Sequence, residues 1–372
     1  MSSLKKKTKK RSPESTPISS LPDDLVLSCF ARVSRLYYPI LSLVSKSCRT
    51  LVASPELYKT RSFFNRTESC LYVCLEFPPD PNPRWFTLYR KPNQTLTNIT
   101  EKTKNSSGYV LAPIPNHHSP SASLVAVGSN IYAIGGSIEN APSSRVSILD
   151  CRSHTWHEAP SMRMKRNYPA ANVVDGKIYV AGGLEDFDSS KWMEVFDTKT
   201  QTWEFVLCPL AERFVYRSLV IDGEIYIFGD KVVTYKPKED RWGDEGEHQS
   251  MDLGLYFHSY CVIDNVLYCY RPGGIKWYES EKRSWRKLRG LKGLSKLASN
   301  CVRLADYGGK IAIFWDKYSP SSGYKSHMIS CAVISLGSCK NQGIRGKVEW
   351  FDDMLTAIPY CYSFVNVLAA TV

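Results

Sequence analysis

A short pattern that returns at a fixed interval constrains the fold of this chain more than any other feature. Strand-like segments that end in small residues are centred on Tyr132, Tyr179 and Tyr226, which lie 47 and 47 residues apart. Two weaker copies surround Tyr268 and Ala312, a further 42 and 44 residues along the chain. Self-similarity at a period of roughly 20–50 residues indicates a protein built from stacked copies of one structural unit.

A tryptophan keeps the same period as the repeated strand. It follows a large apolar side chain by seven residues in four units, in the pairs Leu149 and Trp156, Phe196 and Trp203, Tyr235 and Trp242, and Tyr278 and Trp285. Each unit is expected to hold a buried strand, a second strand, a hairpin turn and a third strand opened by the tryptophan. Such a unit cannot bury both faces of its sheet, so neighbouring units must pack face to face in a closed ring, a β-propeller.

The tryptophans also set the expected number of blades in this ring. Trp85 and Trp350 extend the series at its two ends, so one tryptophan per unit gives six blades, with five and seven as the alternatives. We expect the tryptophans to fill the space between adjacent blades. The apolar segment 362–371 is predicted to form one more strand, which pairs with the first blade and closes the ring.

Glycine pairs relate two of the units to a known repeat. Gly135-Gly136 and Gly182-Gly183 permit close approach of the backbone where strands crowd around a central channel. A glycine pair with a strand end and a downstream tryptophan resembles the kelch repeat, and the likeness weakens from Gly229-Asp230 onwards. The resemblance implies a mainly β chain, with a kelch-type β-propeller over residues 70–372 that binds another protein.

The segment before the propeller has a helical pattern. Pro22, Asp23 and Asp24 suit the first turn of a helix, and residues 38–43 and 45–52 predict two more short helices that stop before Ser54-Pro55. A module of three short helices is too small to bury its own apolar stripe, which comprises Leu21, Leu25, Val26, Leu41, Val44 and Leu51. This stripe either packs on the propeller or binds helices of a partner.

Three stretches of this segment resemble an F-box over residues 21–61: Leu21-Pro22-Asp23-Asp24-Leu25, the run from Leu41 to Leu51, and Ser54-Pro55-Glu56-Leu57. One departure is Cys48, which stands where many F-boxes carry tryptophan. The resemblance implies docking on the Skp-type adaptor of a cullin-based ubiquitin ligase. The expected adaptor-binding residues are Leu21, Pro22, Asp23, Leu25, Val26, Leu41, Val44 and Lys46.

An F-box followed by degenerate kelch repeats is similar to the plant family of F-box/kelch-repeat proteins. That likeness implies the substrate-recognition subunit of a Skp-cullin-F-box ubiquitin ligase, with an unidentified target protein held by the propeller. A kelch scaffold outside any ligase, whose F-box-like segment packs internally, is the alternative, and a propeller enzyme is a third hypothesis.

Charge and cysteine usage narrow the classes of partner. The formal net charge is +12, but the basic residues cluster only in Lys5-Lys6-Lys7 and Lys9-Lys10-Arg11, so nucleic acid is not the expected partner. Residues 1–20 are expected to form a disordered basic tail, or alternatively a nuclear import signal.

No apolar run reaches the roughly 18 residues that a membrane span needs, and we expect a cytoplasmic or nuclear protein. None of the 12 cysteines has the two-residue spacing of zinc pairs, which favours buried thiols in a reducing compartment.

The sequence contains none of the usual catalytic, zinc-binding or nucleotide-binding motifs, so neither an enzyme nor a cofactor or metal is expected. The histidines of His117-His118 and of the His154–His157 pair, and the acidic run Glu185–Asp188, are interpreted as loop residues rather than as metal ligands. Copper-oxidase chemistry would need a Tyr, His and Cys set at the propeller axis, and no pattern marks one.

A target-binding face is predicted from the repeat register. Arg166 and Arg213 each stand thirteen residues before a strand tyrosine, in loops that enter successive blades. Together they are expected to form a basic mouth suited to an acidic peptide, although exposed loop charges without a task are the alternative. Tyr256, Phe257 and His258 are the aromatic candidates for a binding hot spot at the fifth blade.

Overall fold

A computed structural model of the chain describes residues 21–91, 107–115, 123–138, 141–244, 259–271, 273–292, 294, 301–318, 326–339, 343–359 and 362–372. It divides into two compact units, Met1–Thr67 and Glu68–Val372. The expected basic tail lies outside the described residues, as do His117-His118 and the predicted hot-spot residues Tyr256, Phe257 and His258.

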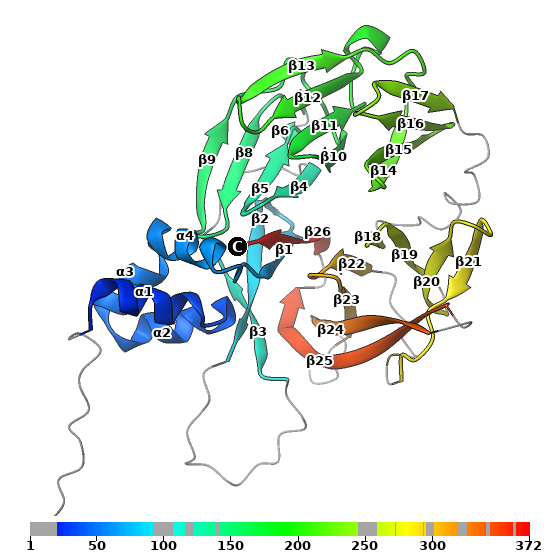
Figure 1. Cartoon of the computed structure of the whole chain (residues 1–372). Coiled ribbons are helices and arrows are strands. Elements are labelled where there is room, and N and C mark those ends of the chain that lie inside the picture. The colour runs from blue at the N-terminus through cyan, green and yellow to red at the C-terminus, as the bar shows by residue number, and fades with distance from the viewer. Residues whose placement is uncertain are drawn as a thin grey trace, which may run out of the picture. The chain divides into compact units, whose positions relative to one another are not determined.

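The first unit is helical and holds one helix more than the sequence pattern predicts (Figure 1). Its elements are α1 (Asp23–Ala31), the 3-10 turn η2 (Arg35–Tyr37), α2 (Tyr38–Val44), α3 (Lys46–Val52) and α4 (Pro55–Phe63). Ser54 and Pro55 were expected to end the helical region, but they begin α4. The Ser54 hydroxyl accepts a hydrogen bond from the Leu57 amide at 3.3 Å, and proline suits the first helical position because its missing N–H has no partner there anyway.

Arg61 of α4 holds the helical unit together from inside. Its side chain is buried, and Nη1 donates to the carbonyl oxygens of Ala31 at 3.2 Å and Val33 at 2.7 Å and to the Tyr38 hydroxyl at 3.1 Å. Nη2 donates to the Arg66 carbonyl at 2.6 Å. The Ala31 carbonyl belongs to the last residue of α1, where helix carbonyls lack partners within the helix, and Val33 follows just beyond the C-cap. The apolar side chains buried in the unit are Phe30, Ala31, Tyr38, Cys48, Leu57 and Tyr58.

The second unit consists of six four-stranded antiparallel sheets arranged as the blades of a propeller (Figure 1), which confirms the predicted blade count. From the inside outwards, blade 1 contains β26 (Ser363–Thr371), β1 (Ser69–Phe77), β2 (Asp80–Arg90) and β3 (Tyr109–Pro113). Blade 2 contains β4 (Ser123–Val127), β5 (Asn130–Ile134), β8 (Val146–Asp150) and β9 (Thr155–Ala159). Blade 3 contains β10 (Ala170–Val174), β11 (Lys177–Ala181), β12 (Met193–Asp197) and β13 (Thr202–Val206).

Blades 4 to 6 follow the same order from the inside outwards. Blade 4 contains β14 (Val215–Ile221), β15 (Glu224–Gly229), β16 (Val232–Lys236) and β17 (Arg241–Asp244). Blade 5 contains β18 (Tyr260–Ile263), β19 (Val266–Arg271), β20 (Gly274–Glu279) and β21 (Ser284–Lys287). Blade 6 contains β22 (Val302–Asp306), β23 (Ile311–Tyr318), β24 (Ser326–Cys339) and β25 (Gly343–Pro359). A small hairpin, β6 (Ser137–Ile138) and β7 (Ala141–Pro142), joins β5 to β8, and the 3-10 turn η3 (Ser189–Lys191) precedes β12.

Each blade has one strand more than the repeat pattern predicts. The additional strand is the innermost one, and the innermost strands of neighbouring blades contact one another all the way round the ring. The tryptophans lie on the outermost strands of blades 2 to 6, as in β13, where Trp203 pairs with Phe196 of β12. In blade 1 the series shifts, because Trp85 lies on the third strand, β2.

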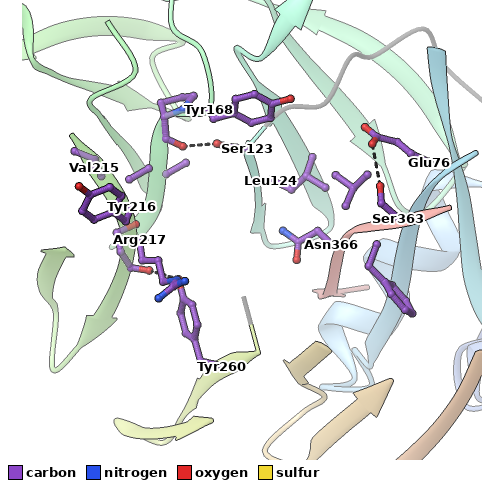
Figure 2. A pocket seen from close by; sticks show the side chains of 16 residues that line it. Glu76, Ser123, Leu124, Tyr168, Val215, Tyr216, Arg217, Tyr260, Ser363 and Asn366 are labelled. Carbon is purple, nitrogen blue, oxygen red and sulfur yellow. Dashed lines mark hydrogen bonds between the residues drawn. The ribbon is translucent and has the colours of Figure 1, made fainter. Parts of the chain in front are cut away.

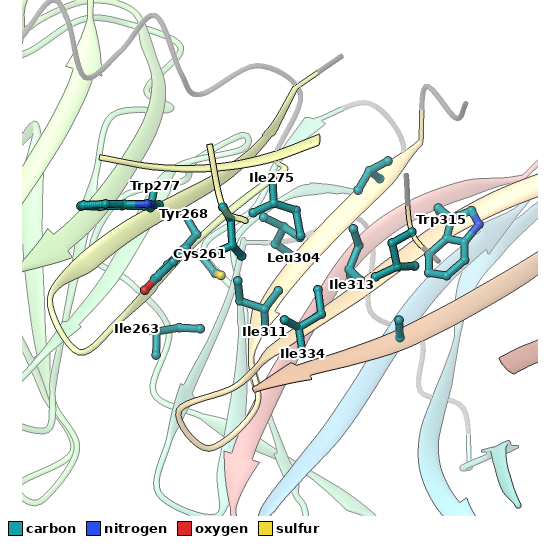
Figure 3. Packing of buried hydrophobic residues seen from close by; sticks show 14 residues of the cluster. Cys261, Ile263, Tyr268, Ile275, Trp277, Leu304, Ile311, Ile313, Trp315 and Ile334 are labelled. Carbon is teal, nitrogen blue, oxygen red and sulfur yellow. The ribbon is translucent and has the colours of Figure 1, made fainter. Parts of the chain in front are cut away.

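Apolar side chains fill the space between adjacent blades. Trp203 of blade 3 packs in one cluster with Tyr132 and Val146 of blade 2, as expected for a residue that separates the two sheets. Figure 3 shows the equivalent packing of blade 5 on blade 6, where Tyr268 and Ile275 share one cluster with Ile311 and Ile334. Each fully buried isoleucine contributes roughly 1.5–3 kcal/mol, so contacts of this kind hold the ring together.

The C-terminal strand closes the ring, as the sequence predicts. β26 is the innermost strand of blade 1 and pairs antiparallel with β1 from Ser69 opposite Thr371 to Glu76 opposite Ser363. The first blade is therefore assembled from the two ends of the propeller segment (Figure 1).

Candidate functional site

The helical unit leaves several large aliphatic side chains exposed. Leu21 and Leu25 are 41% and 50% exposed, and Leu43 and Val44 at the end of α2 are 73% and 64% exposed. Leu21 lies just before the N-cap of α1 and Leu25 lies in its first turn, so both belong to the N-terminal end of this helix. The unit has its own buried core, so these side chains are not needed to fill it.

The other residues expected to bind an adaptor occupy the same two regions. Pro22 caps α1, and its carbonyl accepts hydrogen bonds from the amides of Leu25 and Val26 at 3.0 and 3.1 Å. Asp23 and Lys46 are exposed in the first turns of α1 and α3, whereas Val26 and Leu41 are half-buried. Leu43 was missed by the sequence prediction, although its place between Leu41 and Val44 in an apolar run is a usable signal.

Arg166 does not lie at an exposed mouth, and that part of the sequence prediction is wrong. Its side chain is fully buried, and the guanidinium lies 3.0 Å from the carboxylate of Glu194. It also donates to the carbonyl oxygens of Gly182 at 2.6 Å, Trp192 at 2.8 Å and Lys191 at 2.6 Å. Every one of these partners belongs to blade 3, so Arg166 fastens the loop before β10 to its own blade and is not available to a ligand.

Arg213 stands at the equivalent place before β14 but is exposed. The position that corresponds to Glu194, two residues before the apolar residue that pairs with the tryptophan, is Val233 in blade 4. Without a carboxylate there, burial of the arginine would leave its charge uncompensated. Arg166 and Arg213 thus occupy the same position in their repeats, but the first is buried and the second is exposed.

A cavity of about 670 Å³ lies at the mouth of the central channel, where the innermost strands begin (Figure 2). It is lined by the first residues of β26, β4, β10, β14 and β18 and by Glu76 at the end of β1. A second cavity of about 490 Å³ shares Leu124, Ser218 and Asn366 with it and continues along the channel. The first residues of the innermost strands thus line the cavity at the channel mouth.

Among the residues that the structure describes, two charged side chains line this cavity, Arg217 and Glu76. They lie on opposite sides of it, with Arg217 next to Tyr260 and Glu76 next to Ser363 (Figure 2). The Ser363 hydroxyl donates to Glu76 at 3.0 Å, and the Tyr260 hydroxyl donates to the Ser218 carbonyl at 2.9 Å. Burial raises the pKa of Tyr260, an effect that the neighbouring Arg217 opposes, so the phenol stays protonated at neutral pH.

Two exposed tyrosines form one side of the cavity rim. Tyr168 is 61% exposed and Tyr216 is 58% exposed, and both also line the cavity. The Tyr216 hydroxyl donates to Asp230 at 3.0 Å, and the nearby Phe214 is exposed as well. Large aromatic side chains that stay exposed beside a concave surface are typical of protein-binding sites.

The part of the chain that the structure describes contains no group of three or more His, Cys, Asp or Glu side chains able to hold a metal ion. His154 lies 3.1 Å from the Tyr72 hydroxyl, which also donates to the Cys151 carbonyl at 3.1 Å, and so belongs to the junction of blades 1 and 2. Among the described helices, none combines the length and apolar character of a membrane span.

Comparison with known proteins agrees with this architecture. Residues 85–355 match the model of the FKB95 Kelch-repeats domain, and residues 18–60 match the F-box domain. The F-box/kelch-repeat protein At5g49000 of Arabidopsis thaliana is 87% identical over the full length of both chains. The chain belongs to the plant F-box/kelch-repeat family.

Other members of the F-box/kelch-repeat family from the same plant are also similar over their whole length. F-box/kelch-repeat protein At4g39550 is 58% identical with full coverage of both chains, and At4g39580 is 52% identical over 100% of this chain and 98% of its own. The two matched domains are an F-box and kelch repeats, neither of which is an enzyme family. This combination is that of an F-box substrate adaptor.

Proposed function

We propose that this F-box/kelch-repeat protein is the substrate-recognition subunit of a Skp-cullin-F-box ubiquitin ligase. The helical unit docks on the Skp-type adaptor, and through it on a cullin, while the propeller holds the target protein. The chain itself carries no catalytic step. The observation that carries this proposal is the exposure of Leu21, Leu25, Leu43 and Val44 on a helical unit that already has a complete core.

Burial against a partner is the physical reason for docking. A leucine that moves from water to a fully buried site gains roughly 1.5–3 kcal/mol, so a few such side chains suffice to anchor a helix in a groove. The buried Cys48, where many F-boxes carry tryptophan, lies in the core of the unit and not on this exposed surface. The departure at that position therefore leaves the proposed contact residues in place.

Co-purification of the full chain with a purified Skp-type adaptor tests the proposal. The wild-type protein is expected to retain the adaptor, and Leu43→Ala is expected to weaken retention about 10-fold or more. Leu207→Ala is the matched control, because Leu207 is 74% exposed in the propeller and Leu43 is 73% exposed in the helical unit. Joint replacement of Leu21 and Pro22 by alanine is expected to abolish binding with the propeller still folded.

Failure of the wild-type chain to retain the adaptor, under conditions in which another F-box protein does, would overturn the ligase assignment. The kelch scaffold would then be the better account. Equal losses for Leu43→Ala and Leu207→Ala would show that the helical surface has no special part in the contact.

A further inference from the structure

Arg217 at the channel mouth has no counter-ion in the part of the chain that the structure describes. Its side chain is half-buried, and its Nε atom is buried without a hydrogen-bond partner. Two other arginines of the propeller have partners of a kind that Arg217 lacks among the described residues: Arg166 pairs with Glu194, and Arg163 lies over the ring of Phe205 at 5.0 Å. A desolvated donor of this kind gains free energy from any acceptor that reaches it.

From this position we infer that the cavity accepts an acidic side chain from an extended peptide segment of the target protein. The inference rests on the proposed role of the propeller as the target-binding unit and names the chemistry of that target. The carboxylate pairs with Arg217, and apolar neighbours in the same segment pack on Tyr168 and Tyr216 at the rim.

The charge pattern of the cavity favours a carboxylate near Arg217. Glu76, the second charged residue in the described part of the lining, lies on the far side and accepts a hydrogen bond from Ser363 (Figure 2). A bound carboxylate is therefore attracted to Arg217 on β14 and repelled by Glu76 on β1. Tyr260 lies beside Arg217, but its protonated hydroxyl donates to Ser218 and supplies no negative charge to the guanidinium.

The rim favours a peptide over a free small acid. In an extended segment the side chains point alternately to opposite faces, so residues on either side of one that enters the cavity reach the rim. Tyr168 and Tyr216 border the opening from the starts of neighbouring blades 3 and 4. A small carboxylate alone would leave both rings exposed and would gain only the charge contact.

Binding of two fluorescently labelled pools of short peptides to the full chain tests this inference by fluorescence polarisation. Both pools carry Leu, Phe, Tyr or Ala around a central residue, which is Glu in one pool and its uncharged isostere Gln in the other. The Glu pool is expected to bind about 10- to 100-fold more tightly, because a hydrogen bond to a charged group is involved. Added salt should reduce this preference in the wild-type protein.

Two arginine variants locate the effect. Arg217→Met is expected to bind the two pools equally, and Arg213→Met, which removes an exposed arginine outside the cavity lining, is expected to keep the full preference. Tyr216→Ala should weaken both pools to the same degree. Circular dichroism of each variant verifies that it folds.

Equal binding of the Glu and Gln pools to the wild-type chain overturns the inference, as does the absence of binding to either pool. A loss of preference in Arg213→Met as large as in Arg217→Met places the site elsewhere. Competition by free glutamate as strong as by unlabelled peptide would indicate a small-acid site instead. These results are independent of adaptor binding, since Leu43→Ala should leave peptide binding unchanged and Arg217→Met should leave adaptor retention unchanged.

Discussion

The guanidinium of Arg166 and the carboxylate of Glu194 lie 3.0 Å apart, and neither side chain is exposed to solvent. Glu194 also accepts hydrogen bonds from the amides of Arg163 at 2.7 Å and Met164 at 3.1 Å. The pair therefore ties the loop that enters blade 3 to the third strand of the same blade. The Glu194 carboxylate therefore fixes the backbone of the loop through two amides and also neutralises the buried charge of Arg166.

Glu194→Gln is expected to lower the free energy of unfolding by about 3–5 kcal/mol, because it leaves the charge of Arg166 buried without compensation. Urea unfolding of the full chain followed by tryptophan fluorescence measures the change. Glu158→Gln is the control, since Glu158 pairs with Arg145 at an exposed site and its loss should cost less than about 1 kcal/mol. Similar losses in the two variants would contradict a special role for the buried pair.

Gly183→Ala is expected to destabilise the propeller more than Gly176→Ala. Both glycines have positive φ, +71° and +77°, so the conformational penalty of about 1 kcal/mol is shared. An added Cβ at Gly183 would lie 2.5 Å from the carbonyl oxygen of Asn167, whereas at Gly176 it meets nothing within 4 Å. The clash should add roughly 1–3 kcal/mol, to be read from thermal unfolding of the two variants side by side.

Arg61→Met should unfold the helical unit and leave the propeller intact. The variant removes the donors to three carbonyls and to the Tyr38 hydroxyl, and each buried acceptor left unpaired costs about 1–3 kcal/mol. Hydrogen exchange should rise across residues 21–67 and stay unchanged across 68–372. Arg49→Met, on the exposed surface of α3, is the control, and uniform exchange over both units would contradict the expectation.

Removal of residues 363–372 should prevent the propeller from reaching its native state. Without β26, the ladder of β1 from Ser69 to Glu76 loses its inner partner and apolar side chains such as Val367 leave the core. Limited proteolysis and size-exclusion chromatography of the truncated chain measure the effect. A synthetic peptide of residues 363–372, added during refolding, should restore protease resistance, and a truncated chain as resistant as the full chain would contradict this prediction.

Thiol reactivity should follow burial. Burial raises the pKa of the Cys208 thiol to about 12 and raises those of Cys74, Cys261 and Cys331 well above the usual value, while Cys29 is exposed on α1. The thiolate is the reactive form, so alkylation of the native protein at about pH 8 should modify Cys29 and spare these four. Peptide mapping by mass spectrometry checks this, with all of them reactive in denaturant as the control.

Periodicity made the ring predictable from sequence, because every blade repeats one arrangement of glycines, tyrosine and tryptophan around the same contacts. The innermost strands of blades 2 to 6 were not predicted, because their sequences, such as Val215–Ile221 and Ser123–Val127, share little beyond apolar character. Trp85 fits the tryptophan count yet lies on the third strand of blade 1, where it pairs with Cys74 of β1.

The binding residues were harder to predict, because register gives the place of a residue along the chain and not the direction of its side chain. Arg166 and Arg213 share one register position, and only the presence of Glu194 against Val233 separates a buried arginine from an exposed one. Arg217 lies four residues beyond Arg213, on a strand that the pattern did not include. In the helical unit, Ser54-Pro55 was predicted to end the helical region but begins α4, since a Ser-Pro pair occurs both after the end of a helix and at the start of one.

The pairing of β26 with β1 also sets the order of events during synthesis. The ribosome releases Ser69–Phe77 long before Ser363–Thr371, so β1 must wait with one edge unpaired while five complete blades emerge after it. Unpaired strand edges invite association with other chains, which makes the nascent protein a candidate for chaperone protection until its last strand is released.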